Sequence, residues 1–208
     1  MRPGPASKKP GAREVLVVGL AGPSGCGKTT LAQAVASRLD GLVFALDAYY
    51  RDQRHLTEEE IDVDIPEAIE APFAAEQLRA LVAGSPVDQP VYDFATHSRT
   101  GLTRVLVPAP LVIVEGLFAL YWDELRDLMD TRVFISLDHD ECLRRRSARD
   151  VRDRGRTHDE VVSMYQRKVR PMYEAHVEPT RLHADIVLDG YASIDDLTRA
   201  LLAILRGT

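Results

Sequence analysis

The residues from Gly22 to Thr29 have the types and the spacing of a phosphate-binding loop. Their sequence, GPSGCGKT, fits G-x-x-x-x-G-K-[ST], in which glycines let successive backbone N–H groups surround phosphate oxygens. We expect Lys28 to neutralise the β- and γ-phosphates of a nucleoside triphosphate, and the Thr29 hydroxyl to bind Mg²⁺. The residues predicted to bind the triphosphate here are Gly22, Ser24, Gly25, Cys26, Gly27, Lys28, Thr29 and Thr30. The alternative, a glycine turn that only joins a strand to a helix, is disfavoured because both flanks have the required pattern.

Two acidic residues follow predicted strands and are candidates for metal binding or proton transfer. Asp47 comes after residues 42–46, and Glu115 closes an aliphatic run that begins at Leu111. Ligands of parallel sheets bind at the carboxyl ends of the strands, where a carboxylate can hold Mg²⁺ or accept a hydroxyl proton. For Asp47, capping of a following helix is an equally good interpretation. Glu115 is favoured as functional, because a charge that ends an aliphatic strand needs a partner.

Seven arginines lie between Arg144 and Arg156. We interpret residues 144–158 as a lid, in which a helix and a flexible segment around Gly155 close guanidinium groups over the transferred phosphoryl group. Arginine suits this task because its planar donors bind phosphate oxygens in pairs. The helix would supply Arg145, Arg146 and Arg149, and the segment around Gly155 would supply Arg154 and Arg156.

Two other interpretations of the arginines remain open. One is a solvated helix face with i,i+4 pairs such as Arg146 and Asp150. The other is a nucleic-acid-binding patch in an ATPase, which is weaker because no aromatic residues are interleaved and the net charge is −6.

The hydrophobic pattern predicts the elements that position these residues. Strand-like runs occur at 15–20, 42–46, 111–115, 132–137 and 186–188. Helix-like runs occur at 29–39, 72–83, from 138 onward and at 195–205. This alternation predicts an α/β fold of the P-loop NTPase class, with a mostly parallel sheet flanked by helices. Tyr92 and residues 103–107 are expected to form a small antiparallel ribbon beside it.

Composition indicates one globular domain. The chain has 208 residues, 45% of them hydrophobic and 28% charged, and no apolar run long enough to cross a bilayer. We expect a flexible tail at 1–13, a single kinase domain at 14–208, a cytoplasmic location and no membrane or nucleic-acid partner. Cys26 and Cys142 are far apart in unlike contexts, which argues against a disulfide or a zinc site.

Six segments together resemble the uridine kinase, or uridine-cytidine kinase, family. They are GPSGCGKTT (22–30), DAYYRDQ (47–53), PVYDFATHSR (90–99), VIVEG (112–116), RRSARDVRDRGR (145–156) and VRPMYEAHVEP (169–179). The first is shared with many unrelated NTPases, whereas the third and the fifth are more specific. The resemblance, from Val15 to Gly190, implies phosphorylation of the ribose 5′-hydroxyl of a pyrimidine nucleoside. It also implies ATP or GTP as donor, Mg²⁺ as cofactor and a homo-oligomer.

The resemblance also implies roles for individual residues. Asp47 would be the base that takes the 5′-hydroxyl proton, Asp64 would bind the ribose 2′- and 3′-hydroxyls, and His97 would bind the pyrimidine edge. The implied nucleoside-binding residues are Asp47, Tyr50, Asp64, Tyr92, His97 and Arg146. The implied catalytic residues are Asp47, Lys28, Arg149 and Arg154, and the metal-binding residues are Thr29, Asp47 and Glu115. The arginines implied to face the phosphates are Arg149, Arg154 and Arg156. Without the resemblance, the segment around Tyr92 and His97 is more typical of a buried aromatic pair with a satisfied histidine.

The sequence departs from the family pattern in the predicted acceptor pocket, at Val63, Ile65, Glu70 and Met164. Related kinases with another acceptor, such as phosphoribulokinase or pantothenate kinase, therefore remain an alternative, although the PVYDFATHSR segment speaks against them. A GTPase switch is a third class. It is disfavoured because the chain contains no asparagine and no Thr-Lys-x-Asp motif.

Overall fold

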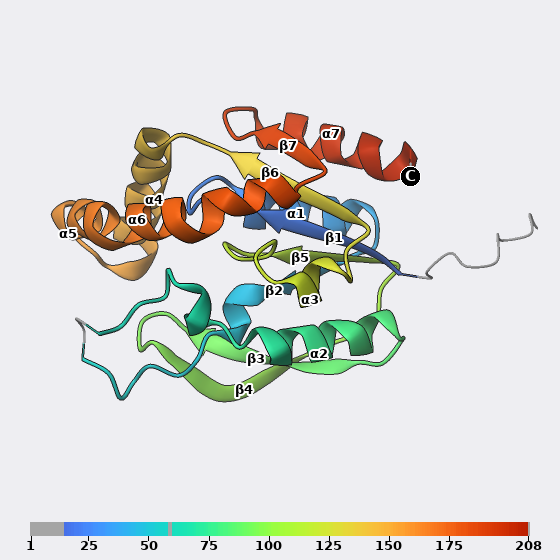
Figure 1. Ribbon diagram of the computed structural model, residues 1–208, viewed down its shortest axis with the longest axis horizontal. Helices are drawn as coiled ribbons and strands as arrows, with labels where there is room; N and C mark the ends of the chain where they lie inside the picture. The colour runs from blue at the N-terminus through green and yellow to red at the C-terminus, as the bar shows by residue number, and fades with distance from the viewer. Residues whose placement is uncertain (1–14, 58–59, 208) are drawn as a thin grey trace, which may run out of the picture.

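Five parallel strands form the central sheet in the described part of this computed structural model (Figure 1). The structure describes residues 15–57 and 60–207, without the side chain of Arg154, so the predicted tail at 1–13 lies outside the described residues. The strand order is β2-β5-β1-β6-β7. Their bounds are β1 Leu16–Ala21, β2 Leu42–Ala45, β5 Leu111–Glu115, β6 Thr131–Ser136 and β7 Ile186–Asp189.

The central strands are buried on both faces, which explains their continuous aliphatic sequences. Every residue of β5, LVIVE, is buried. One face of the sheet packs against α1 (Lys28–Arg38) and α7 (Ile194–Gly207), whose buried residues include Leu31 and Leu201. The other face packs against a second core that includes Phe44 and Phe118. The predicted parallel α/β sheet is confirmed, with helices on both faces.

A separate antiparallel ribbon lies beside the central sheet. β3 (Val87–Asp93) pairs with β4 (Ser98–Leu106), and α2 (Ala71–Val82) packs along the ribbon in the lower part of Figure 1. This ribbon contains Tyr92 and most of the segment 103–107, so the predicted pairing is confirmed. Its turn carries His97, which adopts a left-handed conformation with φ of 50°.

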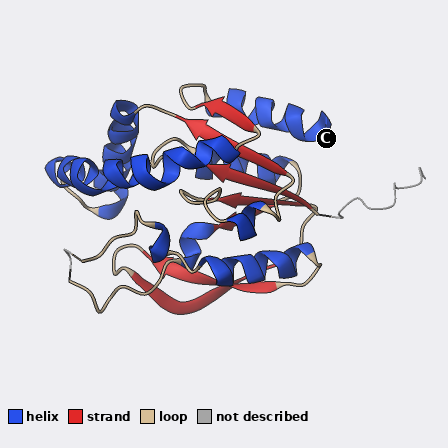
Figure 2. Cartoon of the chain, in the orientation of Figure 1, coloured by secondary structure: helices blue, strands red, loops and turns tan. Residues whose placement is uncertain are grey.

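The carboxyl ends of the central strands point toward a group of helices and loops (Figure 2). α4 (His139–Arg154) ends at Gly155, and α5 (His158–Met164) begins with a capping box of Thr157 and Glu160. The chain then continues through two π-helical segments, Tyr165–Val169 and Tyr173–Val177, which flank α6 (Arg170–Met172), into a 3₁₀ segment, Glu178–His183. Short elements complete the fold: α3 (Asp123–Arg126) and 3₁₀ turns at Leu46–Tyr49 and Pro66–Ala68. None of the described helices is both long and apolar enough to span a bilayer.

Candidate active site

The glycine-rich loop between β1 and α1 is shaped to receive an anion. Gly27 is the N-cap residue of α1, in a left-handed conformation with φ of 96°, and as a glycine it has no side chain to cap the helix. Gly25 also has a positive φ, of 89°, and a Cβ there would lie 3.0 Å from the carbonyl oxygen of Cys142. Both positions therefore need glycine. The uncapped N–H groups and the positive end of the helix dipole are free to bind phosphate oxygens.

The two side chains that open α1 connect the loop to the sheet. The Lys28 ammonium donates a hydrogen bond to the carbonyl oxygen of Pro23, 3.3 Å away, so the side chain folds over the loop. The Thr29 hydroxyl donates to Oε2 of Glu115 at 3.1 Å. Thr30, the next residue, is exposed in the first turn of α1.

Strand register brings the two predicted acids to one edge of the sheet. Glu115 is aligned with Leu20 of β1 and with Ala45 of β2, and Asp47 lies two residues beyond Ala45 in the following 3₁₀ turn. Glu115 is only 3% exposed. Burial, and next the negative charge of Asp47, raise the pKa of Glu115 to about 7. The structure thus places both acids beside the phosphate-binding loop.

These oxygen atoms suit a magnesium ion held partly by phosphates. A hydroxyl and two carboxylates are hard donors, and Mg²⁺ is usually bound by one or two carboxylates together with substrate phosphates and water. Among the described residues, no three His, Cys, Asp or Glu side chains gather into an all-protein metal site. Thr29, Glu115 and Asp47 fit such a shared site, in which Mg²⁺ would be bound together with a nucleotide.

Arg146 connects the phosphate-binding loop to the loop that carries Asp64. Its Nη1 donates to the Ser24 hydroxyl at 3.0 Å and lies 3.9 Å from Oδ1 of Asp64. Arg146 is 4% exposed, and its Nε lies 3.5 Å from Asp150. The i,i+4 pair of Arg146 and Asp150 is therefore present, but the interpretation of this pair as part of a solvated helix face is wrong, because both side chains are buried.

A cavity of about 770 Å³ lies beyond Arg146, between the loop 61–64, the turn of the β3–β4 ribbon and α5. Four of the predicted binding residues line this cavity: Asp64, His97, Arg146 and Arg156. They come from three separate parts of the sequence: Asp64 from the loop 61–64, His97 from the ribbon turn, and Arg146 and Arg156 from the arginine-rich segment. Folding brings these parts together. Sequence reasoning missed Lys168, which also lines the cavity and donates from Nζ to the carbonyl oxygen of Ile61 at 3.0 Å.

Three aromatic rings support the wall of this cavity. Phe94 lines it, and the ring of Tyr92 lies 5.1 Å from that of Phe94 and 5.2 Å from that of Tyr50. The Tyr92 hydroxyl is buried and has no hydrogen-bond partner among the described residues. Burial and the carboxylates of Asp47 and Asp64 raise the pKa of Tyr50 well above its usual value. Tyr92 and Phe94 are only partly buried, so these rings form a packed group but not the expected buried aromatic pair.

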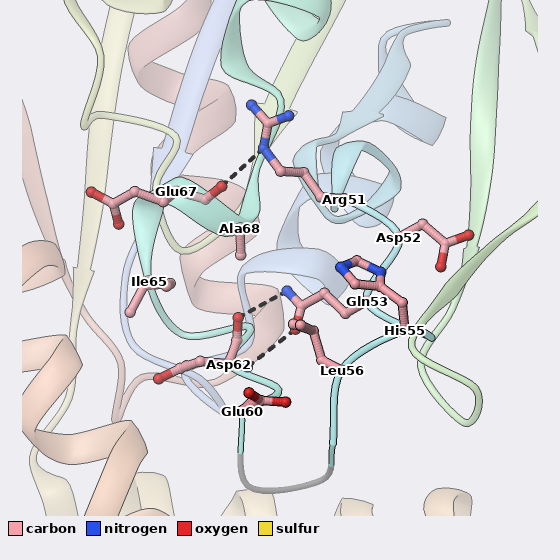
Figure 3. Close-up of a pocket in the computed structure, with 10 residues that line it drawn as sticks. All are labelled: Arg51, Asp52, Gln53, His55, Leu56, Glu60, Asp62, Ile65, Glu67 and Ala68. Atoms are coloured by element: carbon pink, nitrogen blue, oxygen red, sulfur yellow. Dashed lines mark hydrogen bonds between the residues drawn. The ribbon is translucent and has the colours of Figure 1, made fainter.

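A second, smaller pocket of about 230 Å³ shows how the loop that carries Asp64 is fixed (Figure 3). The Gln53 side chain, drawn at its centre, donates to the carbonyl oxygen of Asp62 at 3.0 Å and accepts from the Asp62 amide at 3.1 Å. The backbone N–H of Gln53 donates to the carbonyl oxygen of His97 at 2.9 Å. Gln53 therefore joins the loop to the ribbon turn, a role that its place in the DAYYRDQ segment does not reveal.

Three further residues from the sequence predictions are not found among the described residues that line the larger cavity. Arg149 pairs with Asp150 at 2.8 Å and does not line the cavity. The side chain of Arg154 lies outside the described residues. Cys26 is buried in the loop, and burial raises the pKa of its thiol, so the thiol stays protonated.

Of the four departures from the family pattern, Val63 and Met164 line the larger cavity and Ile65 lines the smaller pocket. Glu70 lines neither pocket. It forms an ion pair with Arg99 at 2.5 Å.

Comparisons with known proteins agree with this geometry. Residues 17–195 match the model of the phosphoribulokinase / uridine kinase family. A uridine kinase of Staphylococcus epidermidis is 41% identical over 84% of this chain and 87% of its own length. A uridine kinase of Streptococcus gordonii is 39% identical over 92% of this chain and 96% of its own. A solved structure from Silicibacter sp., a kinase provisionally assigned to fructose transport, aligns with a TM-score of 0.73 over 86% of this chain and 92% of its own, at 24% identity.

Because its sequence identity is only 24%, the solved structure supports the fold alone. The family match covers most of the chain and includes the phosphate-binding loop, both strand-end acids and the arginine-rich helix. The curated relatives extend over nearly the same length. The chain therefore belongs to the phosphoribulokinase / uridine kinase family.

Proposed function

We propose that the protein transfers the γ-phosphoryl group of ATP to the 5′-hydroxyl of uridine or cytidine, with Mg²⁺. One observation carries this proposal: an uncapped helix N-terminus and two strand-end acids lie at the edge of the sheet that also faces the ligand-sized cavity. Cavities of about 300 to 1,000 Å³ commonly bind small molecules. The names of the curated relatives support a pyrimidine nucleoside as the acceptor.

On the donor side, the chain supplies positive charge and fixed hydrogen-bond donors. The loop amides and Lys28 would hold the β- and γ-phosphates, and Thr29 and Glu115 would hold Mg²⁺. When bound, the ion would neutralise charge on the phosphate oxygens. In this arrangement Lys28 exchanges the carbonyl oxygen of Pro23 for a phosphate oxygen, and the helix dipole of α1 adds to the attraction.

On the acceptor side, Asp47 would take the proton of the 5′-hydroxyl while the oxygen attacks phosphorus. Asp64, held near Arg146, would accept hydrogen bonds from the two other ribose hydroxyls. His97 would read the polar edge of the base, with Phe94 and Tyr92 providing the apolar wall. A flat apolar slot with few polar contacts is what a nucleobase requires.

The test is Asp47→Asn, assayed by coupled ADP release with uridine and cytidine and by calorimetric binding of the nucleoside. We expect kcat to fall by about 10²- to 10⁴-fold while the nucleoside Kd changes little, because a general base contributes about that much to the rate. Asp52→Asn is the matched control, since Asp52 is five residues away and pairs with Arg54 instead. Full activity of Asp47→Asn would contradict the assignment.

The acceptor class needs its own screen, because Val63 and Met164 differ from the family pattern and line the cavity. Uridine, cytidine, ribulose 5-phosphate and pantothenate would be compared with ATP and with GTP as donor. Transfer only to a non-nucleoside would overturn the proposed acceptor. We also propose that the protein serves pyrimidine salvage in the cytoplasm as an assembly of identical subunits, and light scattering of the purified protein tests the assembly.

A further inference from the structure

Among the lid side chains that the structure describes, three arginines contact the same buried carboxylate. Asp150 is fully buried, with 0% exposure. Its Oδ1 lies 2.8 Å from both Nε and Nη2 of Arg149. Its Oδ2 lies 3.5 Å from Nε of Arg146 and 3.4 Å from Nη1 of Arg156. The carboxylate thus binds arginines from α4 and from the segment after it.

The backbone of Asp150 contributes to the same arrangement. Its carbonyl oxygen accepts the N–H of Gly155, the residue that ends α4 in a left-handed conformation with φ of 64°. The Arg156 amide donates to the same oxygen at 3.3 Å. This turn reverses the chain and returns Arg156 to the side of Asp150. One residue therefore fixes both the turn and the guanidinium group that follows it.

The shared carboxylate engages only part of each guanidinium group. Arg149 uses Nε and Nη2 and keeps a side chain that is 36% exposed. The Arg156 side chain is 21% exposed and lines the cavity. Arg146 uses Nε for Asp150 and keeps Nη1 for Ser24 of the phosphate-binding loop. Three arginines face two carboxylates, Asp150 and Asp64, so these five groups keep a net positive charge beside the loop.

We propose that Asp150 is a positioning residue, which holds Arg146, Arg149 and Arg156 in the orientations in which they meet the triphosphate. The inference rests on the proposed function in one respect only, that ATP is the phosphate donor. Asp150 itself does not touch the nucleotide, since it is fully buried. Its effect is preorganisation: guanidinium groups that are already fixed lose less conformational freedom when phosphate binds.

Removal of the carboxylate has two opposing electrostatic consequences. The cluster gains net positive charge, which would strengthen phosphate binding, but the three side chains lose their common acceptor, which would weaken it. Arg146 is buried, and an unpaired buried charge is costly, so Arg146 would move toward its remaining acid, Asp64. We therefore expect loss of orientation to dominate, and the sign of the change in ATP affinity decides between the two effects.

The experiment compares Asp150→Asn with Asp153→Asn in the full chain. Asparagine preserves the shape and removes the charge, and Asp153 is a matched control because it lies on the same helix and its ion pair with Arg152 is exposed. We expect the Kd of Mg·ATP, measured without acceptor, to rise about tenfold to a hundredfold in Asp150→Asn. The Kd of uridine should rise less than that of Mg·ATP, although Arg146 and Arg156 also line the proposed nucleoside cavity. Asp153→Asn should match the wild type.

Three results would overturn the proposal: tighter ATP binding by Asp150→Asn, unchanged ATP binding, or equal losses for ATP and uridine with a lower Tm. Because ATP is bound without acceptor, this readout is independent of the acceptor. A wild type that binds ATP but phosphorylates no nucleoside would contradict the proposed function and leave the inference standing.

A double-mutant cycle with Arg156→Gln provides a second test. If Asp150 acts through Arg156, the effect of Asp150→Asn on the ATP Kd should be clearly smaller in the Arg156→Gln background. Additive effects would overturn the proposal. Should Asp150→Asn fail to fold, Asp150→Glu takes its place in the cycle, since it keeps the charge and displaces it by one methylene group. Weaker ATP binding with a native circular dichroism spectrum then supports positioning, and wild-type affinity overturns it.

Discussion

Thr29 and Glu115 form a hydrogen bond of 3.1 Å that joins the first turn of α1 to the end of β5. The bond connects the two parts of the candidate magnesium site, a hydroxyl from the phosphate-binding loop and a carboxylate from the sheet. Glu115 is buried and lies near Asp47, so its pKa is raised to about 7. Burial and the charge of Asp47 both favour the protonated form of Glu115, whereas a bound cation would favour the carboxylate.

The raised pKa of Glu115 predicts a pH-dependent stability in metal-free buffer. Between the usual pKa of 4.5 and the folded value of about 7, the folded state binds more protons than the unfolded state. The free energy of unfolding therefore falls as pH rises through this range. Glu115→Gln removes this term, so we expect the variant to gain on the wild type as pH rises from about 5 to about 8. Urea unfolding in EDTA at several pH values measures the free energy of unfolding of both proteins. If the two free energies depend on pH in the same way, the prediction is wrong.

Removal of the Thr29 hydroxyl should weaken the binding of the magnesium–nucleotide complex. Thr29→Val keeps the shape and loses the oxygen, and Thr29→Ser keeps the oxygen. We expect the KM for Mg·ATP to rise about tenfold to a hundredfold in the valine variant, because a hydrogen-bonded oxygen ligand is lost. The serine variant should recover most of the loss. Titration of Mg²⁺ at fixed ATP makes the measurement, and equal behaviour of the two variants would exclude a role for the hydroxyl.

The unsatisfied Tyr92 hydroxyl predicts that its removal affects the free energy of unfolding and the uridine Kd differently. Tyr92→Phe removes a buried polar atom that has no partner among the described residues, so the free energy of unfolding should stay constant or rise by about 1 kcal/mol. The uridine Kd should rise, because the hydroxyl is the only side-chain polar group with which Tyr92 could bind a nucleoside.

Tyr49→Phe is the matched control for this prediction. The buried Tyr49 hydroxyl donates to Oε1 of Gln77 at 2.7 Å, so its loss should cost about 1 to 3 kcal/mol. Chemical denaturation and calorimetric titration of both variants provide the comparison. A comparable loss of stability in Tyr92→Phe would show that its hydroxyl has a structural partner.

The sequence was sufficient to predict the parallel sheet and the groups at its edge, because both depend on local patterns. Gly22 to Thr29 form one continuous motif, and Glu115 ends an aliphatic strand whose register follows from the fold. The helices at 165–183 were missed, since π-helical segments and two prolines interrupt the 3.6-residue period. Asp150 was seen only as a partner of Arg146, because burial of a helix face depends on what packs against it.

Arg99 shows a kind of contact that no local pattern predicts, and it carries the last prediction. From β4, its Nε donates to the carbonyl oxygen of Tyr50 at 3.0 Å and its Nη2 to that of Tyr49 at 3.2 Å. Nη2 also pairs with Glu70 at 2.5 Å. These carbonyls lie two and three residues after Asp47, so Arg99 holds the segment that presents the proposed base.

Arg99→Gln should therefore lower kcat more than it raises the nucleoside KM, and it should reduce the free energy of unfolding by about 1 to 3 kcal/mol. Arg99→Lys should recover little, since a lysine ammonium cannot reproduce the planar fork. Arg104→Gln is the control on the same strand, where the side chain is exposed. Steady-state kinetics with urea unfolding would separate the variants. If Arg99→Gln loses stability but keeps kcat, Arg99 supports the ribbon without positioning Asp47.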